Sequence, residues 1–313
     1  MILEYDFFKS RLNSKLFEDS YSDLLRKIAE NPERYIGIFR PTKPKTKLIQ
    51  NITQSHEIRF GDALEFIFER YFEASGFQLH TKRFRTLDDT ELSIDQLFSN
   101  GNVLYMIEQK VRDDHDSTKK VGQFDNFENK YFALSQRYPN YEIRPFMWFI
   151  DDSLEKNRRY YLNRMQSMSS DYGCQPELFY GEQLFLQVDD FDIEIWRETL
   201  NYLERWKATL PDMPEINFDN NAAVVFEEVK DLPPIIYRKL LNNLEVRRQI
   251  FPIIFPNNTV LGMLCDYFFS KSEHIYHTLA ELIVVRVWNQ FSAVIKNDYE
   301  DFADKVVHYI RFL

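Results

Sequence analysis

Apolar residues follow a helical spacing in one part of the chain and a strand spacing in the next. From Ser55 to Ser75 they recur every three or four positions, and Gly76 follows where a helix C-cap is expected. Beyond Gly76, short apolar runs bounded by polar residues predict strands. The elements predicted after the first helix are strands over Phe77–Arg85, Leu92–Asp95 and Val103–Lys110, a helix over Ser117–Tyr138, a strand over Ile143–Ile150, a helix from about Ser153 to Met168 and a strand over Leu178–Tyr180.

The two ends of the chain differ from this alternating middle part. Residues 1–54 begin with a helical pattern that breaks into a basic, proline-containing loop. From Phe191 onward most of the sequence has helical spacing, as Trp196, Leu200, Leu203 and Trp206 illustrate. We therefore expect an N-terminal helical segment over 1–54, an α/β core over 55–190 and a mainly helical C-terminal region over 191–313.

Composition narrows the class of protein. The chain has 313 residues and 44% hydrophobic content, with only 8 glycines and 12 prolines, so it builds a substantial core without low-complexity segments. Its apolar runs are too short to span a membrane, and the N-terminus has no signal-peptide pattern. Two cysteines are too few for a disulfide scaffold. These features predict a cytoplasmic protein with no membrane partner.

The net charge and the distribution of the cations differ in what they indicate about DNA binding. The formal net charge is −10, whereas DNA-binding domains are often basic. The cations are nevertheless gathered in short clusters that flank the middle of the chain. These clusters are Arg40 to Lys47, Lys82 with Arg83 and Arg85, Lys119 with Lys120, and Arg158 with Arg159. This distribution predicts a locally basic cleft in an acidic protein.

The run from Val103 to Lys110 ends in side chains that could take part in catalysis. Glu108 and Lys110 project from one face of the predicted strand, about 7 Å apart. A short connection through residues 99–102 allows this strand to pair as a hairpin with the one that ends at Asp95. Two carboxylates and a lysine are what metal-assisted phosphodiester hydrolysis needs, because the carboxylates bind Mg²⁺ and the ammonium orients water and offsets charge on the phosphorane.

This arrangement resembles the active site of the PD-(D/E)XK nucleases, and the order of elements is similar to their common core. The resemblance implies that Asp95 and Glu108 are catalytic metal ligands, that Lys110 is the catalytic lysine and that the carbonyl of Gln109 also faces the metal. Many members carry a glutamate on the helix before the strands, which Glu65 matches, following Gly61. The chain departs from the pattern in two ways: Ile94 replaces the proline, and Asp88, Asp89 and Glu91 are rival acids nearby.

The segment from Val111 to Gln123 resembles the loop and helix after the active-site strand in type II restriction endonucleases, as do residues 148–161 and 178–182. Lys119, Lys120 and Gln123 open a helix whose N-terminal amides favour a phosphate. We expect these residues, with Lys82 and Arg83, to bind DNA. The resemblance further implies a restriction-endonuclease-like core, a prokaryotic homodimer, sequence-specific cleavage of double-stranded DNA to 5′-phosphate and 3′-hydroxyl ends, and a cognate DNA methyltransferase.

Other hypotheses stay open at this point. A PD-(D/E)XK nuclease of DNA repair or recombination would read DNA structure instead of sequence, and a non-catalytic interaction protein would use its acidic helical half to bind a partner. His115 lies among Asp113, Asp114 and Asp116, but zinc sites usually contain more nitrogen or sulfur ligands. The sequence contains no nucleophile elbow and no glycine-rich phosphate loop.

Overall fold

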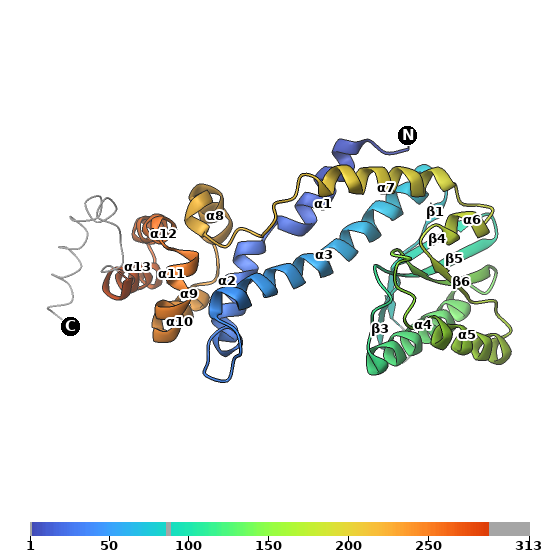
Figure 1. Cartoon of the computed structure of the whole chain (residues 1–313), viewed down its shortest axis with the longest axis horizontal. Coiled ribbons are helices and arrows are strands. Elements are labelled where there is room, and N and C mark those ends of the chain that lie inside the picture. The colour runs from blue at the N-terminus through green and yellow to red at the C-terminus, as the bar shows by residue number, and fades with distance from the viewer. Residues whose placement is uncertain (1, 86–88, 288–313) are drawn as a thin grey trace. The chain divides into compact units, whose positions relative to one another are not determined.

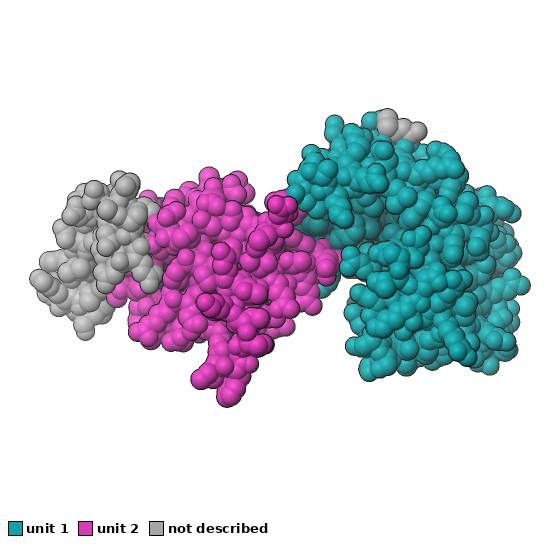
Figure 2. All heavy atoms as spheres, viewed as in Figure 1, with its two compact units in different colours: residues 1–16, 58–210 teal, residues 17–57, 211–313 magenta. Residues whose placement is uncertain are grey.

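The computed structural model describes residues 2–85 and 89–287 and divides the chain into two compact units. Unit 1 comprises residues 1–16 and 58–210, and unit 2 comprises residues 17–57 and 211–313 (Figure 2). The expected N-terminal segment 1–54 is therefore shared, since most of helix α1 (Tyr5–Phe17) belongs to unit 1 and helix α2 (Ser20–Glu30) to unit 2. The boundary after the α/β part falls at residue 210, whereas 190 was expected.

Unit 1 is built on a mixed five-stranded sheet. Its strands, in spatial order, are β1 (Gln78–Leu79), β4 (Gln96–Asn100), β5 (Val103–Lys110), β6 (Glu142–Phe149) and β7 (Glu177–Tyr180). The pairs β1–β4 and β4–β5 are antiparallel, and β5–β6 and β6–β7 are parallel. Strands β2 (Arg83–Arg85) and β3 (Glu91–Ser93) form a separate ribbon. The predicted α/β class is confirmed.

Helices cover both faces of this sheet (Figure 1). On one face Tyr105 and Ile107 of β5 share a core with α1, α3 (Pro44–Ala74), α6 (Gln183–Gln187) and α7 (Ile193–Lys207). On the other face Leu104 and Met106 pack with α4 (Ser117–Arg137) and α5 (Arg158–Tyr172). Because side chains alternate along a strand, Glu108 lies on the α4 face.

Several predicted elements are confirmed, and others differ in their bounds. The hairpin between β4 and β5 is present, with Gly101 in its turn at φ 58°. Asp95, however, precedes β4 and does not close the strand before it, because β3 ends at Ser93 and the residues that pair with β5 begin at Gln96. The predicted strand Phe77–Arg85 is divided into β1 and β2.

Two helices start elsewhere than predicted. Helix α3 begins at Pro44, within the segment taken as a basic loop, since a proline fits the first turn of a helix and Leu48 supplies a fully buried anchor. Helix α5 begins at Arg158, not near Ser153, because Asp113 holds the main-chain amide of Asn157 just before it.

Helices α1 and α7 join unit 1 through contacts between the two ends of the sequence. Phe8, Leu12 and Leu16 of α1 are buried in the same core as the inner side of α7. The indole Nε1 of Trp206 donates a hydrogen bond to Asn13 Oδ1 at 2.9 Å. Sequence spacing identified α7 as a helix but placed it in the C-terminal region, because the partner that buries it is almost 200 positions away.

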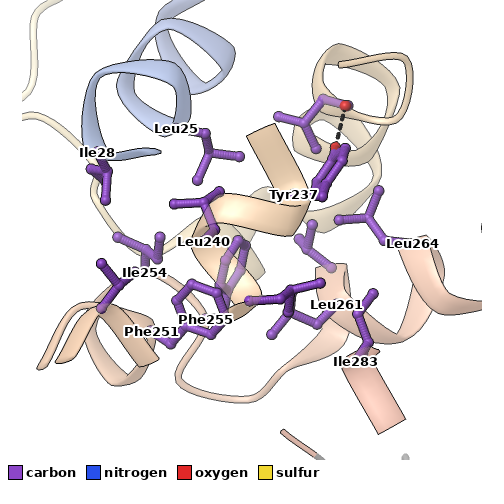
Figure 3. Close-up of a cluster of buried hydrophobic side chains, with 14 of the residues drawn as sticks. Leu25, Ile28, Tyr237, Leu240, Phe251, Ile254, Phe255, Leu261, Leu264 and Ile283 are labelled. Atoms are coloured by element: carbon purple, nitrogen blue, oxygen red, sulfur yellow. Dashed lines mark hydrogen bonds between the residues drawn. The ribbon is translucent and has the colours of Figure 1, made fainter. Parts of the chain in front are cut away.

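Unit 2 is helical. Besides α2 and the start of α3 it contains η1 (Pro32–Arg34), η2 (Phe218–Asn221), α8 (Ala222–Val229), α9 (Pro234–Asn242), α10 (Leu244–Gln249), α11 (Phe251–Ile254), α12 (Thr259–Ser270) and α13 (His274–Val287). Leu25 and Ile28 of α2 pack with Leu240 and Ile254 in its apolar core (Figure 3). The Tyr237 hydroxyl, buried in this core, donates to the carbonyl of Val229. Within the described residues no helix has the length and apolar content needed to cross a membrane.

Two glycines of unit 1 differ in whether the structure has room for a side chain. Gly181, after β7, has φ +52°, and an added Cβ would lie 2.9 Å from Asp152 Oδ2. Gly122 lies inside α4, where an added Cβ meets no atom within 4 Å. We expect Gly181→Ala to lower the free energy of unfolding by about 1–2 kcal/mol, and Gly122→Ala to raise it by about 0.5–1 kcal/mol.

Urea unfolding followed by tryptophan fluorescence measures both effects, since Trp148, Trp196 and Trp206 belong to unit 1. Equal shifts in the same direction for the two variants would contradict the backbone assignment.

Candidate active site

Three oxygen atoms converge on the ammonium group of Lys110 at the end of β5. Lys110 Nζ lies 2.6 Å from Asp95 Oδ2, 2.8 Å from Glu108 Oε1 and 3.0 Å from the main-chain carbonyl of Gln109. Two of these oxygens carry negative charge. The structure thus brings together four of the residues predicted from sequence, around one positive charge.

The pairing of β4 with β5 fixes this geometry. Asp95 stands just before β4, and the amide of Gln109 donates to Asp95 Oδ2 at 2.9 Å. On the opposite face of the sheet, buried Gln96 donates from Nε2 to the carbonyl of Glu65 at 2.6 Å and to Gln109 Oε1 at 3.2 Å. The strand end is therefore held to helix α3 on one face while it presents its charged groups on the other.

A second lysine, missed in the sequence analysis, completes the cluster. Lys130 of α4 places Nζ 2.6 Å from Glu108 Oε2, and both side chains are only 4% exposed. Each oxygen of the Glu108 carboxylate thus contacts a different lysine. The available signal was the position of Lys130 in the inward stripe of α4, three residues after Phe127 and four before Leu134.

Burial and these charges shift the pKa values in opposite directions. Burial raises the pKa of Asp95, and the neighbouring charge of Glu108 adds to this rise. Burial alone would raise the pKa of Glu108 too, but Lys110 and Lys130 together outweigh it and lower that pKa. Burial alone would lower the pKa of Lys110, but the charges of Glu108 and Asp95 outweigh it and raise that pKa. Lys110 is therefore an ammonium ion at neutral pH.

The carboxylate of Glu65 lies next to this cluster and is bridged to it by Lys82. The Lys82 ammonium lies 2.8 Å from Glu65 Oε1, 2.7 Å from Glu69 Oε2 and 3.0 Å from the carbonyl of Asp95. Burial raises the pKa of Glu65 despite its hydrogen bond from Lys82. Lys82, a predicted DNA contact, is therefore half-buried and paired with carboxylates of the protein, whereas Arg83 on β2 is exposed.

The start of α4 shows a similar contrast among the predicted DNA contacts. Asp116 caps the helix by accepting hydrogen bonds from the amides of Thr118 and Lys119, at 3.1 and 2.8 Å. The Lys119 side chain is exposed, while Lys120 Nζ lies 4.8 Å from the centre of the Tyr160 ring. Gln123 is turned inward, where its Oε1 accepts from the Tyr161 hydroxyl at 3.2 Å.

The acid-rich loop between β5 and α4 has a structural anchor. Asp113 is fully buried and accepts hydrogen bonds from the amide and the side chain of Asn157, at 2.7 and 2.8 Å, and from the Tyr180 hydroxyl at 2.9 Å. His115 lies beside it, and burial lowers its pKa. Across residues 2–85 and 89–287, no group of three or more His, Cys, Asp or Glu side chains is placed to hold a metal.

The rival acids are not part of the cluster. Asp89 is 77% exposed and pairs with Arg85 at 2.7 Å. Glu91 is exposed on β3, and Asp88 lies outside the described residues.

The donor set around Lys110 suits a hard cation. Asp95, Glu108 and the Gln109 carbonyl supply oxygen ligands of the kind that Mg²⁺ binds, with water completing the shell. These oxygens already surround one cation, the Lys110 ammonium. Two carboxylates and two ammonium groups also leave the four side chains of the cluster with no formal net charge.

Known proteins are similar to this part of the chain. Residues 78–207 match the family model described as "Type II restriction endonuclease, HinfI". The chain is also similar to the type II restriction enzyme HinfI of Haemophilus influenzae, with 38% identity over 80 residues, which is 23% of this chain and 30% of that enzyme. No solved structure matches the chain. The family match contains the whole cluster around Lys110, whereas Glu65 and unit 2 lie outside it.

The contact between Glu108 and Lys130 makes a prediction about stability. Because each of these groups is buried, Lys130→Met should lower the free energy of unfolding by about 3 kcal/mol. Glu108→Gln removes the charge that Lys130 offsets, so the double variant should be more stable than the sum of the two changes by more than about 1 kcal/mol. Urea unfolding of the four proteins measures this coupling.

The exposed pair Arg158–Glu155, at 2.6 Å, is the matched control. A cycle of Arg158→Met and Glu155→Gln should show coupling below about 0.5 kcal/mol. Additive effects at Glu108 and Lys130 would mean that the two charges do not stabilise one another.

Proposed function

We propose that this protein is a Mg²⁺-dependent endonuclease that hydrolyses double-stranded DNA at a specific sequence, as type II restriction enzymes do. The observation that carries the proposal is the convergence of Asp95, Glu108 and the Gln109 carbonyl on Lys110, inside the segment that matches the HinfI family model. The order of α3, the β1–β4–β5 strands, α4, β6, α5 and β7 supports a PD-(D/E)XK core for this segment.

The residues of the cluster have distinct roles in this proposal. Asp95, Glu108 and the Gln109 carbonyl would hold Mg²⁺, which polarises the phosphate and lowers the pKa of a bound water. The charges of Glu108 and Asp95 raise the pKa of Lys110, so without metal it is an ammonium ion that donates hydrogen bonds. Its charge orients the attacking water and offsets the negative charge that develops on the phosphorane oxygens. Lys110 and Lys130 together lower the pKa of Glu108, with Lys110 at Oε1 and Lys130 at Oε2.

The surroundings of the cluster support a DNA substrate. Lys119 is exposed at the start of α4, about three turns before Lys130 reaches Glu108 on the same helix, and Arg83 is exposed on β2. Positive charge at these positions would contact phosphates and position the duplex. Lys82, Lys120 and Gln123 have partners within the protein, so we assign the main phosphate contacts to Lys119 and Arg83.

The remaining features of the proposal follow from the restriction-enzyme class. We propose cleavage to 5′-phosphate and 3′-hydroxyl ends, a homodimer that reads a palindromic site, and a cognate methyltransferase in a prokaryotic cytoplasm. Digestion of genome-sized DNA followed by sequencing of the ends tests specificity. Ends at one short sequence support a restriction enzyme, ends at junctions or gaps indicate a structure-specific repair nuclease, and no divalent-metal-dependent cleavage indicates a non-catalytic interaction protein.

The catalytic cluster makes the most direct prediction. Asp95→Asn, Glu108→Gln and Lys110→Ala should each reduce the rate of Mg²⁺-dependent plasmid cleavage by at least about a hundredfold, because each removes a ligand or the charge facing the phosphorane. DNA binding in Ca²⁺ should stay within a few-fold for Lys110→Ala. Removal of the metal with EDTA should abolish cleavage by the unmodified protein.

Asp89→Asn is the matched control, since this exposed carboxylate lies outside the cluster. Near-normal cleavage by a folded Lys110→Ala protein would remove the nuclease assignment. Loss of activity in Asp89→Asn alone would instead move the metal site to the β2–β3 ribbon.

The lysines at the start of helix α4 predict how DNA affinity depends on salt concentration. Because phosphate contacts release counterions, replacing Lys119 and Lys120 by alanine should weaken DNA binding and make the dependence of log affinity on log salt shallower by about one unit per lost contact. Most of this change should come from Lys119, since Lys120 is held over the Tyr160 ring.

Alanine at Arg158 and Arg159 is the comparison, and it should have the smaller effect because Arg158 is paired with Glu155. Fluorescence anisotropy over a range of salt concentrations measures the slopes. An unchanged slope for the Lys119/Lys120 variant would show that this helix does not touch the DNA backbone.

A further inference from the structure

Residues 37–47 of unit 2 comprise the connection before α3 and the first turn of that helix, and are here called the basic loop. They present two apolar side chains almost entirely to solvent. Ile38 is 92% exposed and Phe39 is 97% exposed. Other large apolar side chains that are exposed in the described part of the chain reach at most 65%. Single exposed apolar residues are ordinary on protein surfaces, but two adjacent ones with this exposure indicate a contact surface.

The same loop concentrates positive charge. No acidic residue occurs between Glu33 and Glu57, and this interval contains Arg34, Arg40, Lys43, Lys45 and Lys47. Within the described residues none of these five cations forms an ion pair with a carboxylate. Lys47 Nζ donates only to the amide oxygen of Gln50, at 2.9 Å. The loop is therefore a local excess of uncompensated positive charge on an acidic protein.

The protein holds this loop out from its core. Tyr35 and Ile36 on one side and Leu48 on the other are buried in the core of unit 2. Gly37, at φ +141°, redirects the chain directly after the first pair of anchors. The loop extends outward between α2 and α3 (Figure 1). Since anchored residues flank it, Ile38 and Phe39 are presented outward and do not fold back onto the core.

The start of α3 also favours an anionic partner. The first turn of this helix contains no acidic residue, and Lys45 and Lys47 stand there. Cations at a helix N-terminus are unfavourable, because the helix dipole is positive at that end. An anion at this position would be attracted both by the lysines and by the positive end of the helix dipole.

We propose that the basic loop binds duplex DNA, with its lysines on phosphates and with Ile38 and Phe39 against the bases. Duplex DNA combines closely spaced phosphates with apolar base surfaces, and DNA-binding proteins pair cations with apolar side chains that contact or wedge between base steps. The choice of DNA as the polyanion rests on the proposed function. The loop itself lies outside the segment that matches the HinfI family model.

Two variants of the full chain separate the two kinds of contact. Anisotropy of a fluorescent mixed-sequence duplex, measured in EDTA so that no cleavage occurs, gives the affinity at several salt concentrations. Lys43→Ala/Lys45→Ala/Lys47→Ala should make the salt slope shallower by about two to three units. Ile38→Ser/Phe39→Ser should lower affinity on the order of tenfold with an unchanged slope, since it removes apolar contacts and no charge.

Matched controls change the same chemistry elsewhere in unit 2. Arg238→Ala/Lys239→Ala/Arg248→Ala removes three exposed cations from α9 and α10, and Val224→Ser/Ile235→Ser removes two exposed apolar side chains. Both controls should bind DNA as the unmodified protein does. Equal losses in the loop variants and their controls would overturn the proposal.

Three other outcomes would also overturn it. These are unchanged DNA binding by both loop variants, binding of phosphatidylserine vesicles that depends on Ile38 and Phe39 while DNA binding does not, and a change of oligomeric state in sedimentation as the sole effect of Ile38→Ser/Phe39→Ser. The proposed function fails separately, if no metal-dependent cleavage is found. Loop-dependent DNA binding by a protein that does not cleave would leave the basic loop assignment standing without the nuclease.

Discussion

The buried carboxylate of Glu108 is the constraint around which unit 1 is organised. An ionised carboxylate away from water is stable only when opposite charges surround it, and Lys110 and Lys130 each contact one of its oxygens. Lys110 reaches it along the same strand, whereas Lys130 requires helix α4 to pack closely on the sheet. Correct packing of α4 is therefore a condition for a charged Glu108.

The same contacts link stability to chemistry. Asp95 and Glu108 gather oxygen atoms at one point, and the ammonium of Lys110 occupies that point in the protein by itself. This arrangement keeps acidic groups together without leaving them unpaired. It also places the positive charge next to where a phosphate would lie, so that the groups that stabilise the fold are those proposed to act on the substrate.

The two units differ in the way they would meet DNA. In unit 1 the cluster of Asp95, Glu108, Lys110 and Lys130 has as many carboxylates as ammonium groups. Unit 2 carries four cations on the basic loop, and none of the four forms an ion pair with a carboxylate within the described residues. A net charge of −10 is compatible with the proposed DNA binding, because the basic loop concentrates positive charge on a segment that carries no acid.

Local patterns in the sequence determined much of unit 1. The alternation of side chains on a strand placed Glu108 and Lys110 on one face, and the short connection at Gly101 identified the hairpin that brings Asp95 to them. The N-cap Asp116 and the helix it begins were also predictable, because capping depends on residues within one turn. Each of these features involves residues close in sequence, or joined by one turn.

Only the tertiary structure decided the features that depend on distant partners. The contact between Lys130 and Glu108 forms only when α4 packs on β5 and buries both side chains, so the sequence did not identify it. Lys82 was expected on a surface, but two glutamates of α3 enclose its charge. Helix α7 was expected in the C-terminal helical region, whereas it belongs to unit 1, where its partner α1 comes from the other end of the sequence. Periodicity shows which side of an element is apolar, whereas the element that covers that side is selected by packing across the whole chain.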